Sequence, residues 1–277
     1  MEGSGPNGAV RRNPLPWAQH AGYGARMEHS EYVAAARGDL AAICEAVAAG
    51  STDVQVPTCP DFDVDALARH VGAFCLRWTK VVREGHEVPF RSIDAEDPPP
   101  GPQRRAEWLA GVGDELLDLL ATTPPETTRW SWYPEDPTVG FIARRVAHEL
   151  CMHRVDAQGA RGVAGPIDPA LAADGIDEAF FLRAHHARFA AQPLEGSGRT
   201  LHLHGTDGPA DGEPAEWLVR LSPSGLVVTR EHAKGDLALR GATGDLERLL
   251  YQRPTFDEVQ VFGDATVLEE LHRAFTF

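Results

Sequence analysis

The sequence has no long apolar run and carries far fewer basic than acidic residues. A membrane-spanning helix needs about 18 or more consecutive apolar residues, and no such run occurs. Residues 1–27 also lack the continuous apolar centre of a secretory signal. The 26 Lys and Arg against 41 Asp and Glu give a formal charge of −15, which disfavours nucleic acid and anionic membranes as partners. We therefore expect a cytoplasmic monomer or homodimer that acts on a small molecule.

Cysteine is scarce as well. The four cysteines are Cys44, Cys59, Cys75 and Cys151, and no two of them form a Cys-x-x-Cys pair. Redox chemistry and a zinc knuckle are therefore disfavoured. Three of the four fall within helical apolar patterns, which indicates packing. Cys151 keeps some interest because it lies two residues from both Glu149 and His153.

The length of 277 residues and the 43% hydrophobic content suit two domains of ordinary size. Residues 1–27, rich in glycine and proline, are expected to form a flexible leader. Apolar residues at helical spacing predict helices from Ser30 to about 49, over 64–78, over 107–120 and over 141–153, which together favour a four-helix bundle within 28–165. Ser30 is expected to cap the first of these helices and Asp63 the second. The proline-rich and acidic stretch 85–103 is expected to form a long loop over the site.

Beyond residue 165 the periodicity changes from helix to strand. A helix over 170–188 is expected first, packed with the bundle or with the strands after it. Alternating residues at 201–204, 216–221 and 226–229 predict an antiparallel meander, followed by a strand at 236–240, a helix at 243–251, a strand at 259–264 and a closing helix. We expect 166–277 to form a smaller α+β domain. His202 and His204 share one strand face, but no third ligand is in view and metal binding there is not expected.

Glu149 and His153 are the first candidate metal ligands. They are four residues apart, so at about 100° per residue they project from one helix face, roughly 40° apart. His148 and His153 are five apart and point about 140° from each other, which excludes the zinc metalloprotease motif of two histidines four apart. Glu149 could instead form a surface ion pair with Arg145 or Arg154.

His70 is the third candidate ligand. It falls between Leu67 and Phe74 on the apolar face of the predicted helix 64–78, so we expect it to face the core. A lone histidine on such a face is more often a hydrogen-bonded core residue. Taken with Glu149 and His153, however, it completes a set of three ligands for one divalent ion.

These residues lie in segments that resemble the mycothiol-dependent maleylpyruvate isomerase family, in which a DinB-like four-helix bundle precedes a sterol-carrier-like domain. Residues 57–70 (PTCPDFDVDALARH) resemble the proline-cysteine-proline turn that leads to the family's first metal histidine. Residues 149–156 (ELCMHRVD) resemble its Glu-x-x-x-His segment, and residues 249–253 (LLYQR) with 261–264 (VFGD) resemble the second domain.

The resemblance implies that His70, Glu149 and His153 bind the metal and that Arg253 is a catalytic and thiol-binding residue. Arg253 could alternatively be a partner of a helix C-terminus. The chain departs from the family at Phe62, where a tryptophan is usual, and at the preceding Asp61, where glycine is common. These departures leave the substrate open.

The ligand set indicates the chemistry. Two neutral imidazoles and one carboxylate leave coordination positions open, as in catalytic zinc sites. Zinc is the expected ion, although two histidines and a carboxylate also suit iron and oxygen chemistry. A thiol bound at an open position has a lowered pKa and reacts as a thiolate. The resemblance implies that this thiol is mycothiol, acting as a co-substrate.

Three functions are consistent with these expectations. The first is a mycothiol S-transferase acting on an electrophilic small molecule in natural-product biosynthesis or detoxification, favoured by the 85–103 loop, the leader and the altered Asp61-Phe62 turn. The alternative is a mycothiol-dependent cis–trans isomerase of the maleylpyruvate type. The third is a non-catalytic metal-binding regulator, which the intact ligand set disfavours.

Overall fold

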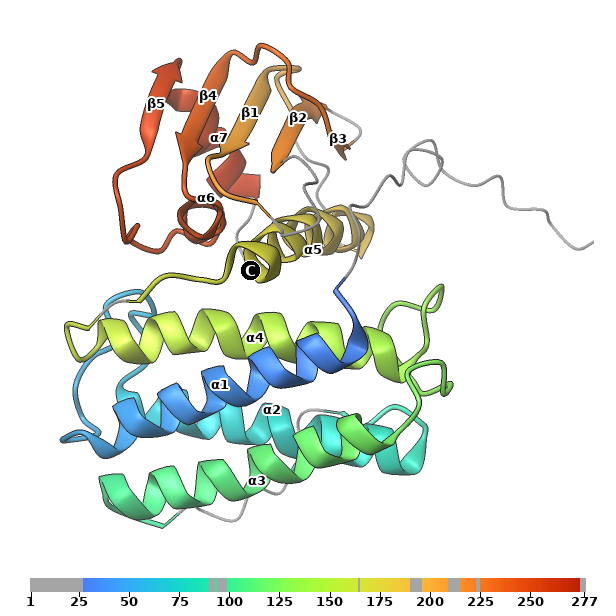
Figure 1. The fold of residues 1–277 in the computed structure, drawn as a ribbon, viewed down its shortest axis with the longest axis vertical. Coiled ribbons are helices and arrows are strands. Elements are labelled where there is room, and N and C mark those ends of the chain that lie inside the picture. The colour runs from blue at the N-terminus through green and yellow to red at the C-terminus, as the bar shows by residue number, and fades with distance from the viewer. Residues whose placement is uncertain are drawn as a thin grey trace, which may run out of the picture.

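The computed structural model describes residues 27–89, 93, 99–163, 165–189, 196–208, 215–222 and 225–274, with only the backbone for 183–189 and 274. The predicted leader, apart from Met27, and residues 90–92 and 94–98 of the predicted 85–103 loop lie outside this part of the chain. The described chain begins with a helical region and continues into a sheet covered by helices (Figure 1). This order confirms the predicted fold class.

A bundle of four helices forms the first part of the described chain. Its helices are α1 (His29–Ala48), α2 (Val64–Glu84), α3 (Pro102–Thr122) and α4 (Val139–Gly159). α1 and α2 each pack against both α3 and α4. Ile43, Leu67, Leu116 and Ile142, one from each helix, are fully buried in a shared core. The predicted bundle is therefore confirmed.

The helix starts agree only in part with the local signals of the sequence. Asp63 caps α2 as predicted, because its side chain accepts a hydrogen bond from the Ala66 amide at 2.7 Å. α1 instead begins after Glu28, which forms a capping box with Glu31, so Ser30 lies inside the helix and its predicted capping role is wrong. α3 begins earlier than the predicted 107, with a proline in its first turn.

The second part of the described chain contains a mixed five-stranded sheet. Its strands are β1 (Thr200–Gly205), β2 (Glu216–Ser222), β3 (Gly225–Thr229), β4 (Leu237–Gly241) and β5 (Gln260–Gly263), in the order β3-β2-β1-β4-β5. The first three form the predicted antiparallel meander. β4 pairs with β1 in parallel and β5 is antiparallel to β4. The connection from β3 to β4, residues 230–236, therefore crosses the sheet past β2 and β1.

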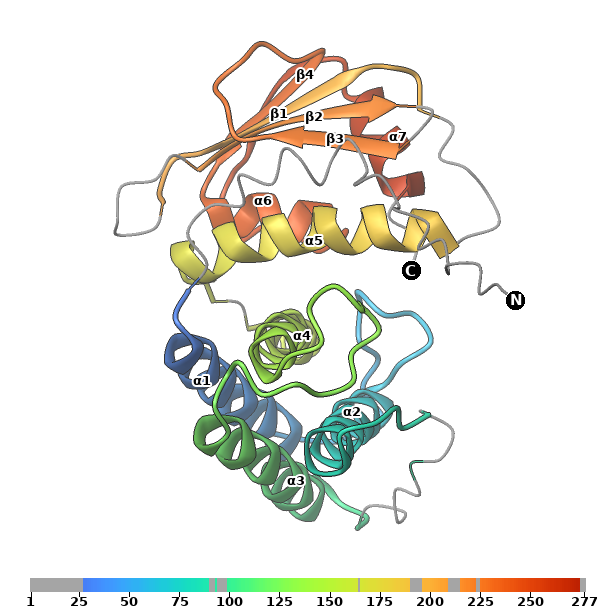
Figure 2. The ribbon, with the colours of Figure 1, turned by 90° about the vertical axis from the view of Figure 1, so that its right-hand side faces the viewer.

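Three helices cover one face of this sheet, as Figure 2 shows. They are α5 (Pro169–Phe189), α6 (Thr243–Leu250) and α7 (Thr266–Ala274). Ile176 of α5, Leu246 of α6 and Leu271 of α7 share a core with Leu203 and Trp217 of the sheet. α5 lies between the sheet and α4, so it joins the two parts of the molecule. Among the described helices, none is long and apolar enough to cross a membrane.

Candidate active site

Two helices of the bundle bring the three predicted ligands together. His70 lies on α2, and Glu149 and His153 lie one turn apart on α4. Nε2 of His70 lies 3.5 Å from Oε1 of Glu149, and Nε2 of His153 lies 3.2 Å from the same oxygen. The two imidazole rings meet edge to face, with centroids 4.8 Å apart. One donor atom from each residue therefore faces a common point.

His70 is less buried than the sequence predicted. Its side chain is 32% exposed, whereas the neighbouring apolar residues Leu67 and Val71 are fully buried. The expectation that His70 faces the core is wrong in this respect, because a pocket opens on its side of α2. Phe62, from the turn before α2, packs against the ring with a centroid distance of 5.5 Å. The imidazole therefore forms part of a pocket wall.

The second oxygen of Glu149 is held by an arginine. Nη2 of Arg145 donates to Oε2 at 2.6 Å, while Nη1 of Arg145 bonds to Glu178 on α5. The pair with Arg145 that the sequence allowed does form, but the arginine is buried rather than on the surface. Arg154 pairs instead with Asp39 at 2.6 Å. Burial raises the pKa of Glu149, but Arg145 and the two imidazoles outweigh burial and hold this pKa well below its usual range.

The second nitrogen of His153 is held by Asp156. Nδ1 of His153 lies 3.1 Å from Oδ2 of Asp156, one turn along α4. Burial lowers the pKa of His153, but its hydrogen bonds to Asp156 and Glu149 outweigh burial and raise it to about 9 when no metal is present. Metal-ligating histidines typically have such a carboxylate on the second nitrogen.

Arg253 reaches this site from the second part of the chain. Nε and Nη2 of Arg253 donate to the two oxygens of Asp156 at 3.0 and 2.9 Å. Nη1 donates to the Tyr251 carbonyl at 2.7 Å, and Nη2 lies 3.6 Å from Sγ of Cys59. A continuous chain of contacts therefore runs from Arg253 through Asp156 to His153.

The three candidate ligands open into a pocket of about 550 Å³ built from both parts of the molecule. α2 and α4 supply four polar residues of its lining, and Trp132, Leu182 and Tyr251 add apolar surface from other segments. The pocket is lined by Cys59, Phe62, His70, Trp132, Arg145, Glu149, Met152, His153, Leu182, Tyr251 and Arg253. All four site residues predicted from the sequence therefore line one pocket.

Two side chains near the candidate ligands in sequence point elsewhere. His148 is buried and its Nε2 lies 2.7 Å from Oδ1 of Asp174 on α5, so it faces away from His153 as the spacing predicted. Cys151 is fully buried, and burial raises the pKa of its thiol well above the usual range. Cys151 was of interest because it is near Glu149 and His153 in the sequence, but its buried position does not support a role at the site.

Sequence reasoning missed several lining and supporting residues. Asp156 could have been found, because it follows His153 by three residues and so shares its helix face. Cys59 lies in the turn before α2, where the sequence indicated only a family motif. Arg145 was expected only as a surface partner. Tyr251 gave no signal, because only the tertiary structure brings the end of α6 next to the bundle.

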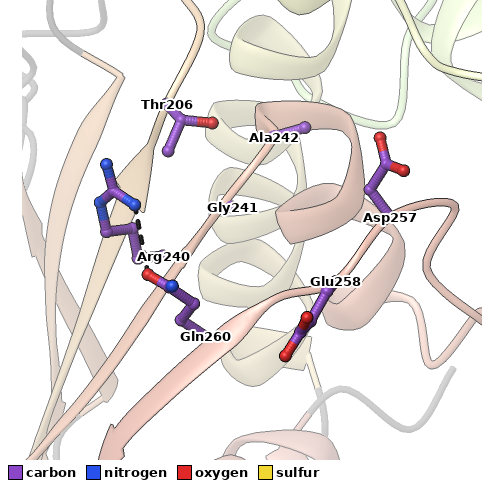
Figure 3. Close-up of a pocket in the computed structure, with 7 residues that line it drawn as sticks. All are labelled: Thr206, Arg240, Gly241, Ala242, Asp257, Glu258 and Gln260. Atoms are coloured by element: carbon purple, nitrogen blue, oxygen red, sulfur yellow. Dashed lines mark hydrogen bonds between the residues drawn. The ribbon is translucent and has the colours of Figure 1, made fainter.

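A separate pocket of about 270 Å³ lies at the edge of the sheet (Figure 3). Arg240 and Gln260 lie opposite each other on β4 and β5 and share a hydrogen bond of 3.2 Å. Asp257 and Glu258 complete its polar lining, which includes no histidine or cysteine. We therefore place the candidate chemistry in the bundle pocket.

The structure thus combines a helical bundle that carries a His-Glu-His cluster with an α+β unit that contributes Arg253 to the same pocket. The family model for the "Mycothiol maleylpyruvate isomerase N-terminal domain" matches residues 33–158. This match agrees with the resemblance on which the sequence motifs were interpreted.

Solved structures agree with this assignment. The crystal structure of a mycothiol-dependent maleylpyruvate isomerase is 11% identical, with a TM-score of 0.58 over 85% of this chain and 93% of that one. A mutant of a mycothiol-dependent maleylpyruvate isomerase gives a TM-score of 0.54 at 11% identity, over 80% and 88% of the two chains. At this identity the likeness establishes the fold. No curated protein matches the chain.

Proposed function

We propose that this chain is a metal-dependent mycothiol S-transferase, in which the thiolate of mycothiol forms a carbon–sulfur bond to an electrophilic small molecule by conjugation or by thiol exchange. The observation that carries the proposal is the meeting of His70, Glu149 and His153 at one point of a pocket lined by both parts of the chain. The family of residues 33–158 supports mycothiol as the thiol.

The donor set fits a divalent ion. In a tetrahedral zinc site, with metal–ligand distances of about 2.0–2.2 Å, ligand atoms lie about 3.3–3.6 Å apart. The two imidazole nitrogens lie 3.5 and 3.2 Å from the Glu149 oxygen. Three protein ligands leave at least one position for a thiol, as in catalytic sites. A divalent ion held there supplies the positive charge that lowers the pKa of the thiol sulfur.

The surrounding residues hold the ligands in place. Arg145 binds one oxygen of Glu149, which leaves the other oxygen directed at the two imidazoles. Asp156 fixes the ring orientation of His153, and Arg253 in turn holds Asp156 with two parallel hydrogen bonds. Arg253 therefore has a structural partner as well as the thiol-binding role predicted from the sequence.

The pocket wall suits a two-part ligand. Trp132, Leu182 and Tyr251 offer apolar surface, whereas Arg145 and Arg253 contribute charged groups. A volume of about 550 Å³ is within the range of small-molecule sites, roughly 300–1,000 Å³. We assign the charged residues to the thiol and the apolar residues to the electrophile.

Isomerisation is the second candidate, because the two similar solved structures reported above are maleylpyruvate isomerases. In isomerisation the thiolate adds to a conjugated double bond, a single bond rotates, and the thiol leaves unchanged. In transfer the carbon–sulfur bond persists in the product. Mycothiol labelled with heavy sulfur separates the two, since transfer predicts label in the product and isomerisation predicts full recovery of the thiol.

The proposal is tested by turnover assays with the metal-loaded protein, mycothiol and a panel of electrophiles and cis-dienoic acids. We expect turnover only when both metal and mycothiol are present. His70→Ala should abolish turnover, whereas His86→Ala, an exposed histidine just beyond α2, should not. If metal-loaded protein binds no mycothiol and turns over no substrate, the proposal fails and a metal-binding regulator replaces it.

A further inference from the structure

A second group of histidines gathers around one carboxylate on the sheet. His202 and His204 are alternate residues of β1, so both point to the face opposite Leu201 and Leu203. Those two leucines are fully buried in the core shared with α5, α6 and α7. The histidines therefore lie on the face of the sheet that these helices do not cover (Figure 2).

Two further side chains complete the group. Glu216 is the register partner of His204 on the neighbouring strand β2, so the two side chains share a face. His232 comes from the connection between β3 and β4, which crosses the sheet past β2 and β1. Three separate segments of the chain thus converge on one carboxylate.

Hydrogen bonds to the shared carboxylate hold the donor atoms of the four side chains close together. Oε1 of Glu216 lies 2.6 Å from Nδ1 of His204 and 3.0 Å from Nδ1 of His232, and Oε2 bonds to Nε2 of His202. One ligand atom from each of the four residues lies within 4.8 Å of all the others. The three ring centroids are 5.0–6.1 Å apart. All three rings therefore present a nitrogen to the same small volume.

Three neutral imidazoles can each donate one N–H to the carboxylate, which brings the four side chains together without an ion. The same three imidazoles and carboxylate are a donor set that suits zinc and neighbouring transition metals. The sequence contains the pair on β1, but the third and fourth ligands become visible only when the sheet register and the crossing connection are known.

We infer that His202, His204, Glu216 and His232 bind a second divalent transition-metal ion of the zinc type. Four protein ligands fill a tetrahedral site, which is the arrangement of structural rather than catalytic zinc. The ion would tie the 230–236 connection to β1 and β2. This inference does not depend on the function proposed for the bundle pocket.

Zinc binding by the untagged, full-length protein tests the inference. Metal-freed protein is titrated with zinc against a chromophoric chelator, and cobalt absorption is recorded in parallel. The variants are His232→Ala, His204→Ala with His232→Ala, and His86→Ala as the control. His232 is 74% exposed, so its removal leaves the fold intact, and His86 is similarly exposed outside the cluster.

We expect His232→Ala to weaken one zinc site by about tenfold or more, the size of effect that lost metal-supporting contacts produce. The double variant should bind one ion fewer than His86→Ala. His70→Ala should still bind zinc at the sheet, and adding the two sheet substitutions should remove that ion. The His70→Ala variant tests the sheet site independently, because loss of metal binding in the bundle leaves the sheet ion bound.

Two results would overturn the inference. One is a double variant that binds as much zinc as His86→Ala with unchanged affinity. The other is a His70→Ala protein that binds no zinc at micromolar concentrations. Melting temperature measured with and without zinc gives an independent readout, because an ion that binds only the folded state stabilises it. A zinc-dependent rise should persist in His70→Ala and vanish when the sheet substitutions are added.

Discussion

The described part of the chain contains two clusters of histidine and glutamate that have similar donor atoms but very different surroundings. The bundle cluster has three residues, His70, Glu149 and His153, in the wall of a pocket. The sheet cluster has four residues on the open face of a sheet, one of them the exposed His232. Ligand type alone would place both in the same category.

The surroundings distinguish them. Around the bundle cluster, Arg145 and Asp156 hold the ligands, and Arg253 holds Asp156. Three ligands beside a pocket leave room for a substrate, whereas four ligands fill a tetrahedral ion. The number of residues, the supporting contacts and the adjoining space are the grounds on which we propose catalysis in the bundle and stabilisation in the sheet.

Removing the negatively charged candidate ligand of the bundle is the strongest test of the proposed difference between the two clusters. Glu149→Gln keeps the size of the side chain but loses the charge that balances the ion. Outer contacts to a metal ligand are worth about 10–100-fold, so we expect loss of a ligand to reduce mycothiol-dependent turnover by about 100-fold or more. Metal content and turnover are measured on the same sample.

Glu115→Gln is the matched control for this change. Glu115 is also a helical glutamate paired with an arginine, Arg83, at 2.6 Å, but it lies on the surface. It should retain metal and turnover. Equal activity in the two variants would show that Glu149 is only a partner of Arg145.

Removing the support of a ligand should have a smaller effect. Asp156→Asn keeps the shape but weakens the contacts to His153 and Arg253. We expect metal affinity at the bundle site to fall by about 10–100-fold while the sheet site is unchanged. Asp264→Asn, which alters an exposed pair with Arg199 at 2.9 Å, serves as the control. Unchanged affinity in Asp156→Asn would mean that His153 is held in place by packing alone.

A third polar cluster, buried on the opposite side of α4, is centred on Asp174, to which its other members form hydrogen bonds. Asp174 bonds to Nε of Arg144 at 2.6 Å, to His148 at 2.7 Å and to the Tyr32 hydroxyl at 2.7 Å. All four side chains are buried. Burial raises the pKa of Asp174, but Arg144 and the other partners outweigh it and lower the pKa below its usual range. Such a group stabilises the fold without leaving a vacancy for a ligand.

Asp174→Asn should therefore affect stability and leave metal binding unchanged. Breaking a buried ion pair costs about 3–5 kcal/mol in the free energy of unfolding at pH 7. Because the folded pKa lies below the unfolded value of about 3.9, this stabilisation is present above about pH 4 and is lost as the pH falls further.

Urea unfolding at pH 7 and at about pH 3 measures this difference. The difference in the free energy of unfolding between the wild type and Asp174→Asn should be smaller at the lower pH. Asp118→Asn, which alters an exposed pair with Arg37, should have almost the same free energy of unfolding as the wild type at either pH. If the loss of stability in Asp174→Asn did not change with pH, it would be due to packing rather than to charge.

The sequence predicted most of what depends on local spacing. Glu149 and His153 share a helix face because they are four residues apart, and Asp63 caps α2 because its side chain reaches the first turn. The family resemblance supplied His70 and Arg253, which are far from α4 in sequence. Both line the same pocket as Glu149.

The features that the sequence could not predict depend on tertiary contacts. Glu216 and His232 join His202 only through the sheet register and the crossing connection. Tyr251 enters the pocket only because the end of α6 lies next to the bundle. The exposure of His70 likewise results from the pocket and not from the apolar stripe on which it lies.

The smallest expected effect concerns the cysteine that lines the bundle pocket, a residue type that the sheet cluster lacks. Cys59 lines the pocket and lies 3.6 Å from both Asp156 and Arg253. Burial, together with the charge of Asp156, raises the pKa of its thiol. At neutral pH the thiol is therefore protonated, and a thiol is a far weaker nucleophile than a thiolate.

We expect Cys59→Ala to change mycothiol-dependent turnover by no more than about twofold, as for a side chain outside the chemistry. Iodoacetamide at pH 7 should label Cys59 slowly, with faster labelling as the pH rises, and mass spectrometry of the digested protein measures both. Cys44→Ala, at a position outside the pocket, is the control. If Cys59→Ala instead abolished turnover while metal content stayed intact, the reacting sulfur would belong to the protein, and the role given to mycothiol would pass to Cys59.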